Sequence, residues 1–200
     1  VNDLDSTIFD VYKYAGINSV LRFDTRDDEL FPVHGINWNT KLNWYTSLNN
    51  NKKLYYKLSS DFSFYRGLFN PPFSTVFAFR IGGALIGGEY PFFEAPSLGY
   101  ESNLRGFRRS RFTGEKSLYQ NSEIRIKLFN FHNYIANGQI GMLMFYDSGR
   151  VWYKNEKSNN WHHGLGTGIW LSPFDLAVLN VSYAHSIEED LVTFRFSYLF

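Results

Sequence analysis

The sequence contains no cysteine, carries a net charge of only +1 and has no uninterrupted run of eighteen apolar residues. The missing cysteines exclude disulfides and thiolate metal sites, although they identify no compartment by themselves. The near-neutral charge gives no support for a nucleic-acid-binding surface, so we expect no nucleic-acid partner. Without a long apolar run, the backbone could be satisfied in lipid only by a closed β-barrel.

Aromatic residues, in contrast, make up 20% of the chain and alternate with polar ones. The alternation is clearest in segment 191–200, where one side carries Val192, Phe194, Phe196, Tyr198 and Phe200. About nine to eleven tilted residues cross the hydrocarbon core, so this segment is long enough to span it. It predicts a membrane strand with its aromatic side toward lipid, whereas an outer strand of a soluble sandwich would alternate in the same way.

Nine segments have strand character and are separated by polar or turn-forming stretches, with no helical period between them. These segments are 18–25, 36–44, 54–64, 75–85, 122–129, 139–147, 163–171, 177–185 and 191–200. In 122–129, Glu123, Arg125 and Lys127 share one side. A Lys or Arg facing lipid at the midplane costs roughly 2–4 kcal/mol, so that side predicts a lumen. The expected fold class is all-β, a transmembrane antiparallel β-barrel.

The connection 87–119 is much longer than the others and carries Leu104-Arg105-Gly106-Phe107, followed by more arginines. A loop of this length usually has a function. Its basic residues would ordinarily be a solvated face. If the loop instead folds into the lumen, a buried arginine needs a carboxylate partner. Glu123 and Asp147 lie on inward sides and are the candidates.

Two further patterns surround Asp147. Phe145, Asp147 and Gly149 share one side of their segment, and the following segment has glycine at 164, 166 and 168. Glycine at every second strand position is destabilising by itself. The glycines make sense as clearance, if the long loop lies directly against the barrel wall at this point.

The pair His162-His163 is a possible metal site, but adjacent strand residues point to opposite faces and cannot both bind one ion unaided. An aromatic and histidine band at the membrane boundary explains the pair better. We therefore expect no metal, no cofactor and no catalytic residue.

These motifs resemble the C-terminal part of the BamA/TamA superfamily of outer-membrane assembly and translocation barrels, also known as the bacterial surface antigen family. Residues 104–107 match the family's (V/L)RG(F/Y) motif at the tip of the sixth extracellular loop. Residues 145–149 match its FxDxG motif, and the last segment ends in Phe200 as the family's terminal strand does.

The resemblance implies that residues 1–200 are the C-terminal portion of one outer-membrane barrel domain, nine strands of sixteen, with loop 87–119 directed into the lumen. The remaining strands would come from the same or another chain, and the family's POTRA repeats are not in this sequence. Residues 1–10 have no basic segment before an apolar one, so we expect any export signal to lie outside the sequence. The implied location is the bacterial outer membrane.

The resemblance also implies roles for particular residues. Leu104, Arg105, Gly106 and Phe107 would lock the loop inside the barrel, with Arg105 paired to Asp147 first and Glu123 second, and with Phe145 and Gly149 beside them. The terminal strand, with Phe194, Phe196, Tyr198 and Phe200, would act as an assembly signal and as one side of a lateral seam.

The function implied is insertion or translocation of client outer-membrane or secreted polypeptides, without chemical catalysis. The other partners would be the lipid bilayer and accessory lipoproteins. The sequence is also compatible with two alternatives. One is a passive porin-like barrel, and the other is the barrel domain of a fused hydrolase of the patatin-like or phosphoesterase kind.

Overall fold

The computed structural model describes residues 13–48, 53–69, 74–100, 102–132, 137–153, 160–174 and 176–200. Over these residues the chain forms one nine-stranded sheet, which confirms the all-β prediction and the number of strands. The strands are β1 Tyr14–Asp24, β2 His34–Ser47, β3 Leu54–Phe69, β4 Thr75–Gly88, β7 Lys116–His132, β8 Asn137–Trp152, β9 His162–Pro173, β10 Leu179–Ser186 and β11 Asp190–Arg195.

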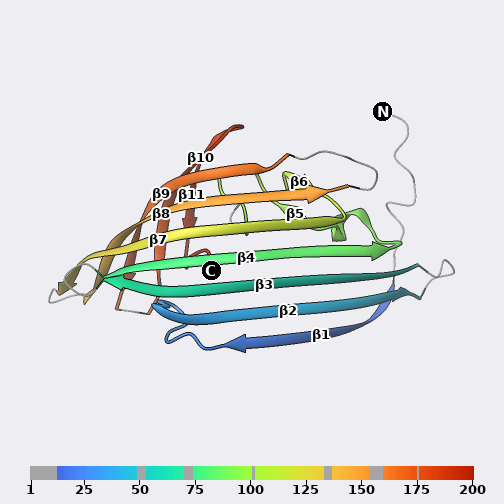
Figure 1. Ribbon diagram of the computed structural model, residues 1–200, viewed down its shortest axis with the longest axis horizontal. Coiled ribbons are helices and arrows are strands. Elements are labelled where there is room, and N and C mark those ends of the chain that lie inside the picture. Colours follow the sequence, from blue (N-terminus) through green and yellow to red (C-terminus); the bar gives the residue numbers. More distant parts are fainter. Residues whose placement is uncertain are drawn as a thin grey trace.

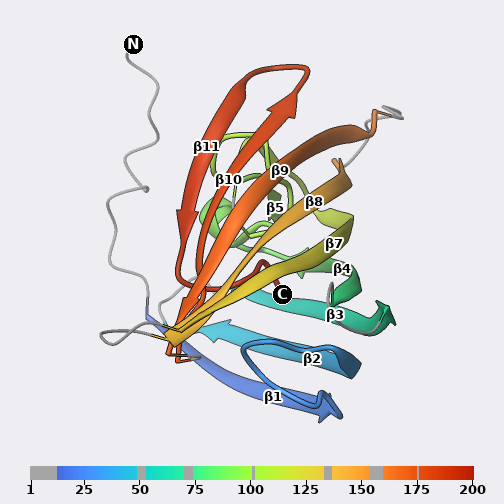
Figure 2. The same ribbon diagram turned by 90° about the vertical axis from the view of Figure 1, so that its left-hand side faces the viewer.

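The nine strands follow one another across the sheet, and every neighbouring pair is antiparallel. Figure 1 shows them side by side, and Figure 2 shows that the sheet curves, with the chain between β4 and β7 on its concave side. That connection contains the short helix η2 (Phe92–Glu94) and the small pair β5 (Ser97–Leu98) and β6 (Phe112–Thr113). Among the described residues, no helix is long and apolar enough to cross a membrane.

The two faces of the sheet differ as the strand period of two requires. On β10 every second residue is buried on the concave face, whereas Val181 and Tyr183 are exposed on the convex face. The convex face is mainly apolar, and two of its polar residues, Thr40 and Ser60, are paired within the face. The Trp38 indole and the Thr40 hydroxyl both hydrogen-bond to the Ser60 hydroxyl. This pairing satisfies the hydroxyl groups of Thr40 and Ser60 on the outer surface.

Strand β7 begins earlier than the sequence pattern indicated. Its expected start was residue 122, but residues 116–121 pair with both β4 and β8. The reason is that Ser117, Tyr119 and Asn121 continue the inward alternation and are buried on the concave face. The connection expected at 87–119 is accordingly shorter, and it runs over 89–115.

The last strand is shorter than expected, and the prediction of an uninterrupted strand over 191–200 is wrong. Strand β11 ends at Arg195, and no later residue pairs with β10. Phe194 and Phe196 are exposed on the convex side as expected, at 72% and 82%. Tyr198 and Phe200 were expected there too, but the chain turns into the concave side after β11. Only 7% of Tyr198 is exposed, and the Phe200 ring lies 6.1 Å from the ring of Tyr65.

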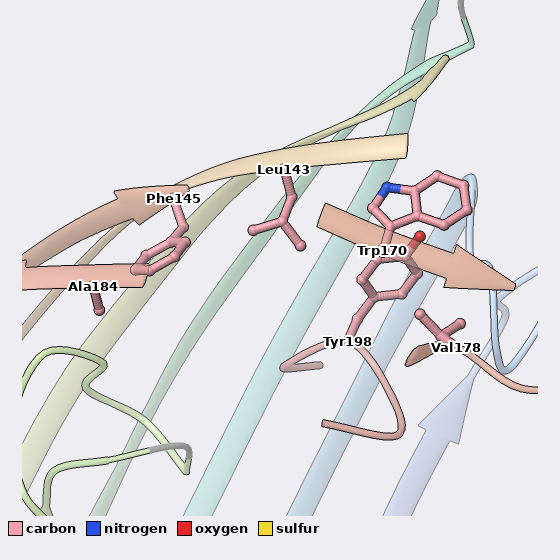
Figure 3. Packing of buried hydrophobic residues seen from close by; sticks show 6 residues of the cluster. All are labelled: Leu143, Phe145, Trp170, Val178, Ala184 and Tyr198. Carbon is pink, nitrogen blue, oxygen red and sulfur yellow. The ribbon is translucent and has the colours of Figure 1, made fainter. Parts of the chain in front are cut away.

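The residues that receive Tyr198 form one of two apolar clusters on the concave side. This cluster spans β8, β9, β10 and the terminal residues, and Figure 3 shows its members: Leu143, Phe145, Trp170, Val178, Ala184 and Tyr198. The Tyr198 ring meets the rings of Trp170 and Phe31 edge to face, at centroid distances of 5.8 and 6.0 Å. Such contacts stabilise beyond simple area burial and explain why the aromatic residue turns inward.

Candidate functional site

The loop between β4 and β7 carries its own apolar core and packs it on the sheet. Leu98, Leu104 and Phe107 are fully buried, together with Phe112 and Tyr119 of β6 and β7. Leu104 precedes Arg105 in the sequence and Phe107 follows it, so these apolar contacts fix the backbone on both sides of the arginine. The loop lies within the curve of the sheet in Figure 2.

Arg105 reaches Asp147 of β8 through three hydrogen bonds. Its Nε and Nη2 atoms donate to Asp147 Oδ2 and Oδ1 over 2.7 and 2.8 Å. The backbone N–H of Arg105 donates to Oδ2 as well, over 3.1 Å. This parallel pairing of a guanidinium with a carboxylate is the strongest geometry available to the two groups. The structure thus brings the expected first partner to Arg105.

Glu123 of β7, the expected second partner, takes the remaining side of the same guanidinium. Arg105 Nη1 donates to Glu123 Oε2 over 2.8 Å, and Arg125 Nε donates to Glu123 Oε1 over 2.7 Å. Glu123 therefore bridges two arginines. We refer to Arg105, Asp147 and Glu123 as the Arg105 cluster.

The Arg105 cluster is almost completely shielded from solvent. Arg105 is 2% exposed, Glu123 1% and Asp147 0%. Burial disfavours the charge on Arg105, but Asp147 and Glu123 outweigh this effect and raise its pKa above the usual value. A buried ion pair costs desolvation energy and is tolerated only when its geometry and hydrogen bonds are complete. Here the loop can leave the wall only by separating buried charges.

The other residues of the two motifs contact the cluster or its surroundings. The Phe145 ring lies 3.5 Å below the Arg105 guanidinium, a cation–π arrangement. Gly149 leaves room for Leu98, because a Cβ atom there would lie 2.8 Å from a Leu98 methyl carbon. Gly106 has a φ of +88°, which a residue with a side chain rarely adopts.

The glycines of β9 provide clearance, as the sequence indicated, but only one of them clears the loop itself. A Cβ atom on Gly164 would lie 2.0 Å from the carbonyl oxygen of Arg105. Gly166 instead makes room for the Phe145 ring, and Gly168 faces Ser182 of β10. The loop backbone therefore rests directly on the wall at Gly164.

Two attachments of the loop were missed by the sequence reasoning. Arg80 of β4 donates to Asn121 Oδ1 over 3.0 and 2.8 Å and to the Ser102 carbonyl over 2.7 Å. The Ser186 hydroxyl of β10 donates to the Gly106 carbonyl over 2.6 Å. Arg80 could have been found from its inward position on an otherwise apolar strand; Ser186 belongs to no motif.

Arginines that follow the motif form weaker contacts at the surface. Arg108 pairs with Glu189 at 3.0 Å and Arg111 with Glu188 at 2.7 Å, both in the turn between β10 and β11. The two arginine side chains are 78% and 50% exposed, in contrast to that of Arg105. They add modest attraction between the loop and the last hairpin.

The two adjacent histidines lie on different sides of β9. The His162 ring stacks on Phe112 of the loop at 3.6 Å, and His163 Nδ1 lies 2.8 Å from the Tyr146 hydroxyl on the convex side. Over the described ranges, no three His, Asp or Glu side chains are grouped so that they could hold a metal ion.

A curved antiparallel sheet with an apolar convex face and a charged, loop-filled concave face has the features of an outer-membrane barrel wall. The family model for the Omp85 superfamily domain matches residues 13–198. The chain therefore belongs to the Omp85 superfamily, and the sheet is part of a β-barrel of the BamA/TamA type. No curated protein sequence matches the chain.

This membership confirms the family to which the sequence motifs pointed. Omp85 proteins are outer-membrane barrels of protein assembly and translocation, and they are generally not enzymes.

Proposed function

We propose that this chain is the barrel part of a machine that inserts client polypeptides into the bacterial outer membrane or translocates them across it, without a chemical step. The observation that carries the proposal is the Arg105 cluster, which holds the tip of a long loop inside the barrel. A loop secured by buried charges occupies space that a free diffusion pore would leave to water. The arrangement therefore favours assembly or translocation over a passive porin.

We further propose that residues 1–200 form the C-terminal portion of one barrel domain and that further strands complete the wall. Among the described residues, β1 pairs only with β2 and β11 only with β10. An unpaired strand edge in hydrocarbon is costly, because its backbone groups find no water. Further strands, from the same or another chain, would satisfy these edges and close the lumen.

In this proposal the Arg105 cluster keeps the loop in the position that client handling requires. The terminal residues would contribute to assembly through their exposed aromatics: Phe194 and Phe196 face outward beside the free edge of β11. A client strand could add to that edge by backbone hydrogen bonds, which is a common mode of β-strand recognition.

The proposal is tested by insertion of an unfolded outer-membrane barrel protein into phospholipid vesicles containing the full natural chain. We expect insertion to be faster than into empty vesicles and to fall at least several-fold with Arg105→Ala. Arg109→Ala is the matched control, since Arg109 lies in the same loop and is exposed. Equal insertion with and without the protein, together with steady ion conductance, would instead favour the porin.

A further inference from the structure

A groove crosses the convex face of the sheet at the end where the long connection leaves β4 and enters β7. It has a volume of about 380 Å³ and lies over β3, β4, β7 and β8, which Figure 1 shows side by side. Small-ligand sites have volumes of about 300–1,000 Å³, so the groove is large enough to hold part of a ligand. The residues that line it include Leu58, Gly83, Leu85, Lys116, Leu118 and Trp152.

The strand register places this lining on the convex side. Val151 packs on the apolar core of the loop, which lies on the concave side, so its neighbours Arg150 and Trp152 point outward. Lys116 is the cross-strand partner of both Trp152 and Leu85. Directly paired residues share one face of a sheet, so these side chains form one outward row.

The floor of the groove is apolar and open. Gly83 stands between Ser60 of β3 and Leu118 of β7 in the register, and it has no side chain to fill the space. The Ser60 hydroxyl is already hydrogen-bonded to Trp38 and Thr40. The floor therefore suits hydrocarbon better than a ligand that needs hydrogen bonds.

The end of the groove nearest the long connection is positively charged. Lys116 is exposed, and within the described ranges it forms no ion pair. The Arg150 guanidinium lies 4.7 Å from the centre of the Trp152 ring, at the outward position paired with Leu118. Among the described residues that line the groove, none is acidic. The charge at this end therefore favours an anion.

The same end of the groove lies at the edge of the apolar band. Lys116 is the first residue of β7, and Trp152 is the last residue of β8. The rings of Trp44 and Tyr56 lie 6.2 Å apart near the corresponding ends of β2 and β3. Tryptophan and tyrosine collect where a membrane meets water, and lysine extends its ammonium group to that level. The groove thus leads from the level of the lipid headgroups into the hydrocarbon.

We propose that this groove binds a membrane lipid with an anionic phosphate headgroup. Its acyl chain lies over Gly83, and its phosphate lies beside Lys116 and Arg150. Because the convex face is the outside of a barrel wall, the occupant is a lipid of the surrounding membrane and not a soluble phosphate. The inference goes beyond the proposed function, since it needs only the membrane-facing wall and no client polypeptide.

Quenching of Trp152 fluorescence tests this proposal. The full natural chain is placed in phosphatidylcholine vesicles that contain increasing fractions of phosphatidic acid with brominated acyl chains, which quench the tryptophans they contact. The signal of Trp152 is the difference between the unsubstituted chain and Trp152→Phe. We expect phosphatidic acid to quench it at a mole fraction at least threefold lower than brominated phosphatidylcholine does. Equal quenching by the two lipids would overturn the proposal.

A pair of double variants tests where the headgroup lies. Lys116→Gln combined with Arg150→Gln should remove the preference for phosphatidic acid, because both cations beside the phosphate are lost. The control combines Lys13→Gln with Arg109→Gln, two exposed positions outside the groove, and should keep the preference. A preference that persists without Lys116 and Arg150 would contradict the assigned headgroup position.

A second pair of variants tests the groove itself. Leu118→Phe places a ring over the floor at Gly83 and should raise the mole fraction of phosphatidic acid needed for quenching at least threefold. Leu21→Phe, at an exposed outward position of β1, should leave it unchanged. If the two variants behave alike, the acyl chain does not occupy the groove.

A soluble competitor separates a lipid from a free phosphate. Glycerol 3-phosphate carries the same phosphate without acyl chains, and at the concentration of the lipid it should not protect Trp152 from quenching. Protection by this competitor would show that the site takes a free phosphate, and it would overturn the assignment to a lipid.

Discussion

Two segments lie against the same inner wall and are held there differently. In the loop, all three side-chain nitrogens of Arg105 bond to carboxylates. At residues 196–200, Arg125 gives one nitrogen to Glu123 and one to the main-chain oxygen of Phe200, and its Nη1 is without a partner among the described residues. The loop is thus fixed by an ion pair in which every guanidinium nitrogen is bonded, whereas residues 196–200 are held mainly by aromatic contacts and by a guanidinium with one unpaired nitrogen.

The largest effect on the loop is expected from Arg105→Ala. The change leaves the carboxylates of Asp147 and Glu123 buried without the Arg105 guanidinium. Removing one partner of a buried ion pair costs about 3–5 kcal/mol. We expect loop 89–115 to become sensitive to protease in micelles, while Arg109→Ala leaves it protected. Equal protection in the two variants would show that the apolar contacts of Leu104 and Phe107 suffice.

The next effect is expected from Gly164→Ala. The added Cβ would meet the Arg105 carbonyl at 2.0 Å, so the loop backbone must shift, and overpacking of this kind costs about 1–3 kcal/mol. Hydrogen exchange of the Arg105 amide should accelerate. Gly67→Ala is the control, because its closest contacts are side-chain atoms of Val33 and His34. Unchanged exchange at Arg105 would mean that the loop does not rest on Gly164.

A smaller and more local effect is expected from Tyr198→Ala. It removes the ring that packs on Trp170 and Arg125, which weakens the attachment of residues 196–200 by about 1–2 kcal/mol. The Arg105 cluster is untouched, so loop protection should persist while residues 196–200 become accessible to protease. Phe196→Ala, at an exposed position, should change neither region. Loss of loop protection in Tyr198→Ala would mean that the two segments are not held independently.

The smallest effect is expected from Arg108→Ala. Its pair with Glu189 is largely exposed on the arginine side, and such pairs contribute about 0–1 kcal/mol. Protease sensitivity of the loop should change slightly at low ionic strength and not at all in high salt, where exposed charges are screened. An effect as large as that of Arg105→Ala would place the main attachment of the loop at the surface instead.

The sequence allowed prediction of the features that depend on neighbouring residues. The nine strands could be predicted because alternation is a local property of each segment. The candidate partners of Arg105 could be named because a buried arginine needs a carboxylate. Glu123 and Asp147 were the carboxylates at suitable inward-facing strand positions. Arg105 and Asp147 are 42 residues apart in the sequence. Only the family motifs indicated that Asp147, rather than Glu123, is the main partner.

The remaining features depend on contacts between residues distant in the sequence. The alternation of inward and outward side chains does not encode such contacts. Residues 196–200 alternate equally well as a strand or as a tucked segment, and the choice is made by Arg125 and Trp170, far away in the chain. The early start of β7 was missed because its polar inward residues resemble a loop. Arg80 and Ser186 both hydrogen-bond to the loop, but neither residue belongs to a sequence motif.

The most direct test of the central claim is a double-mutant cycle on the buried pair, with Arg105→Glu, Asp147→Arg and their combination. The measured quantity is the free energy of loop opening from hydrogen exchange in micelles. Because the reversed pair restores opposite charges, the combined variant should recover about 0.5–3 kcal/mol relative to the sum of the single changes. Strictly additive effects would contradict the claim that this ion pair holds the loop inside the barrel.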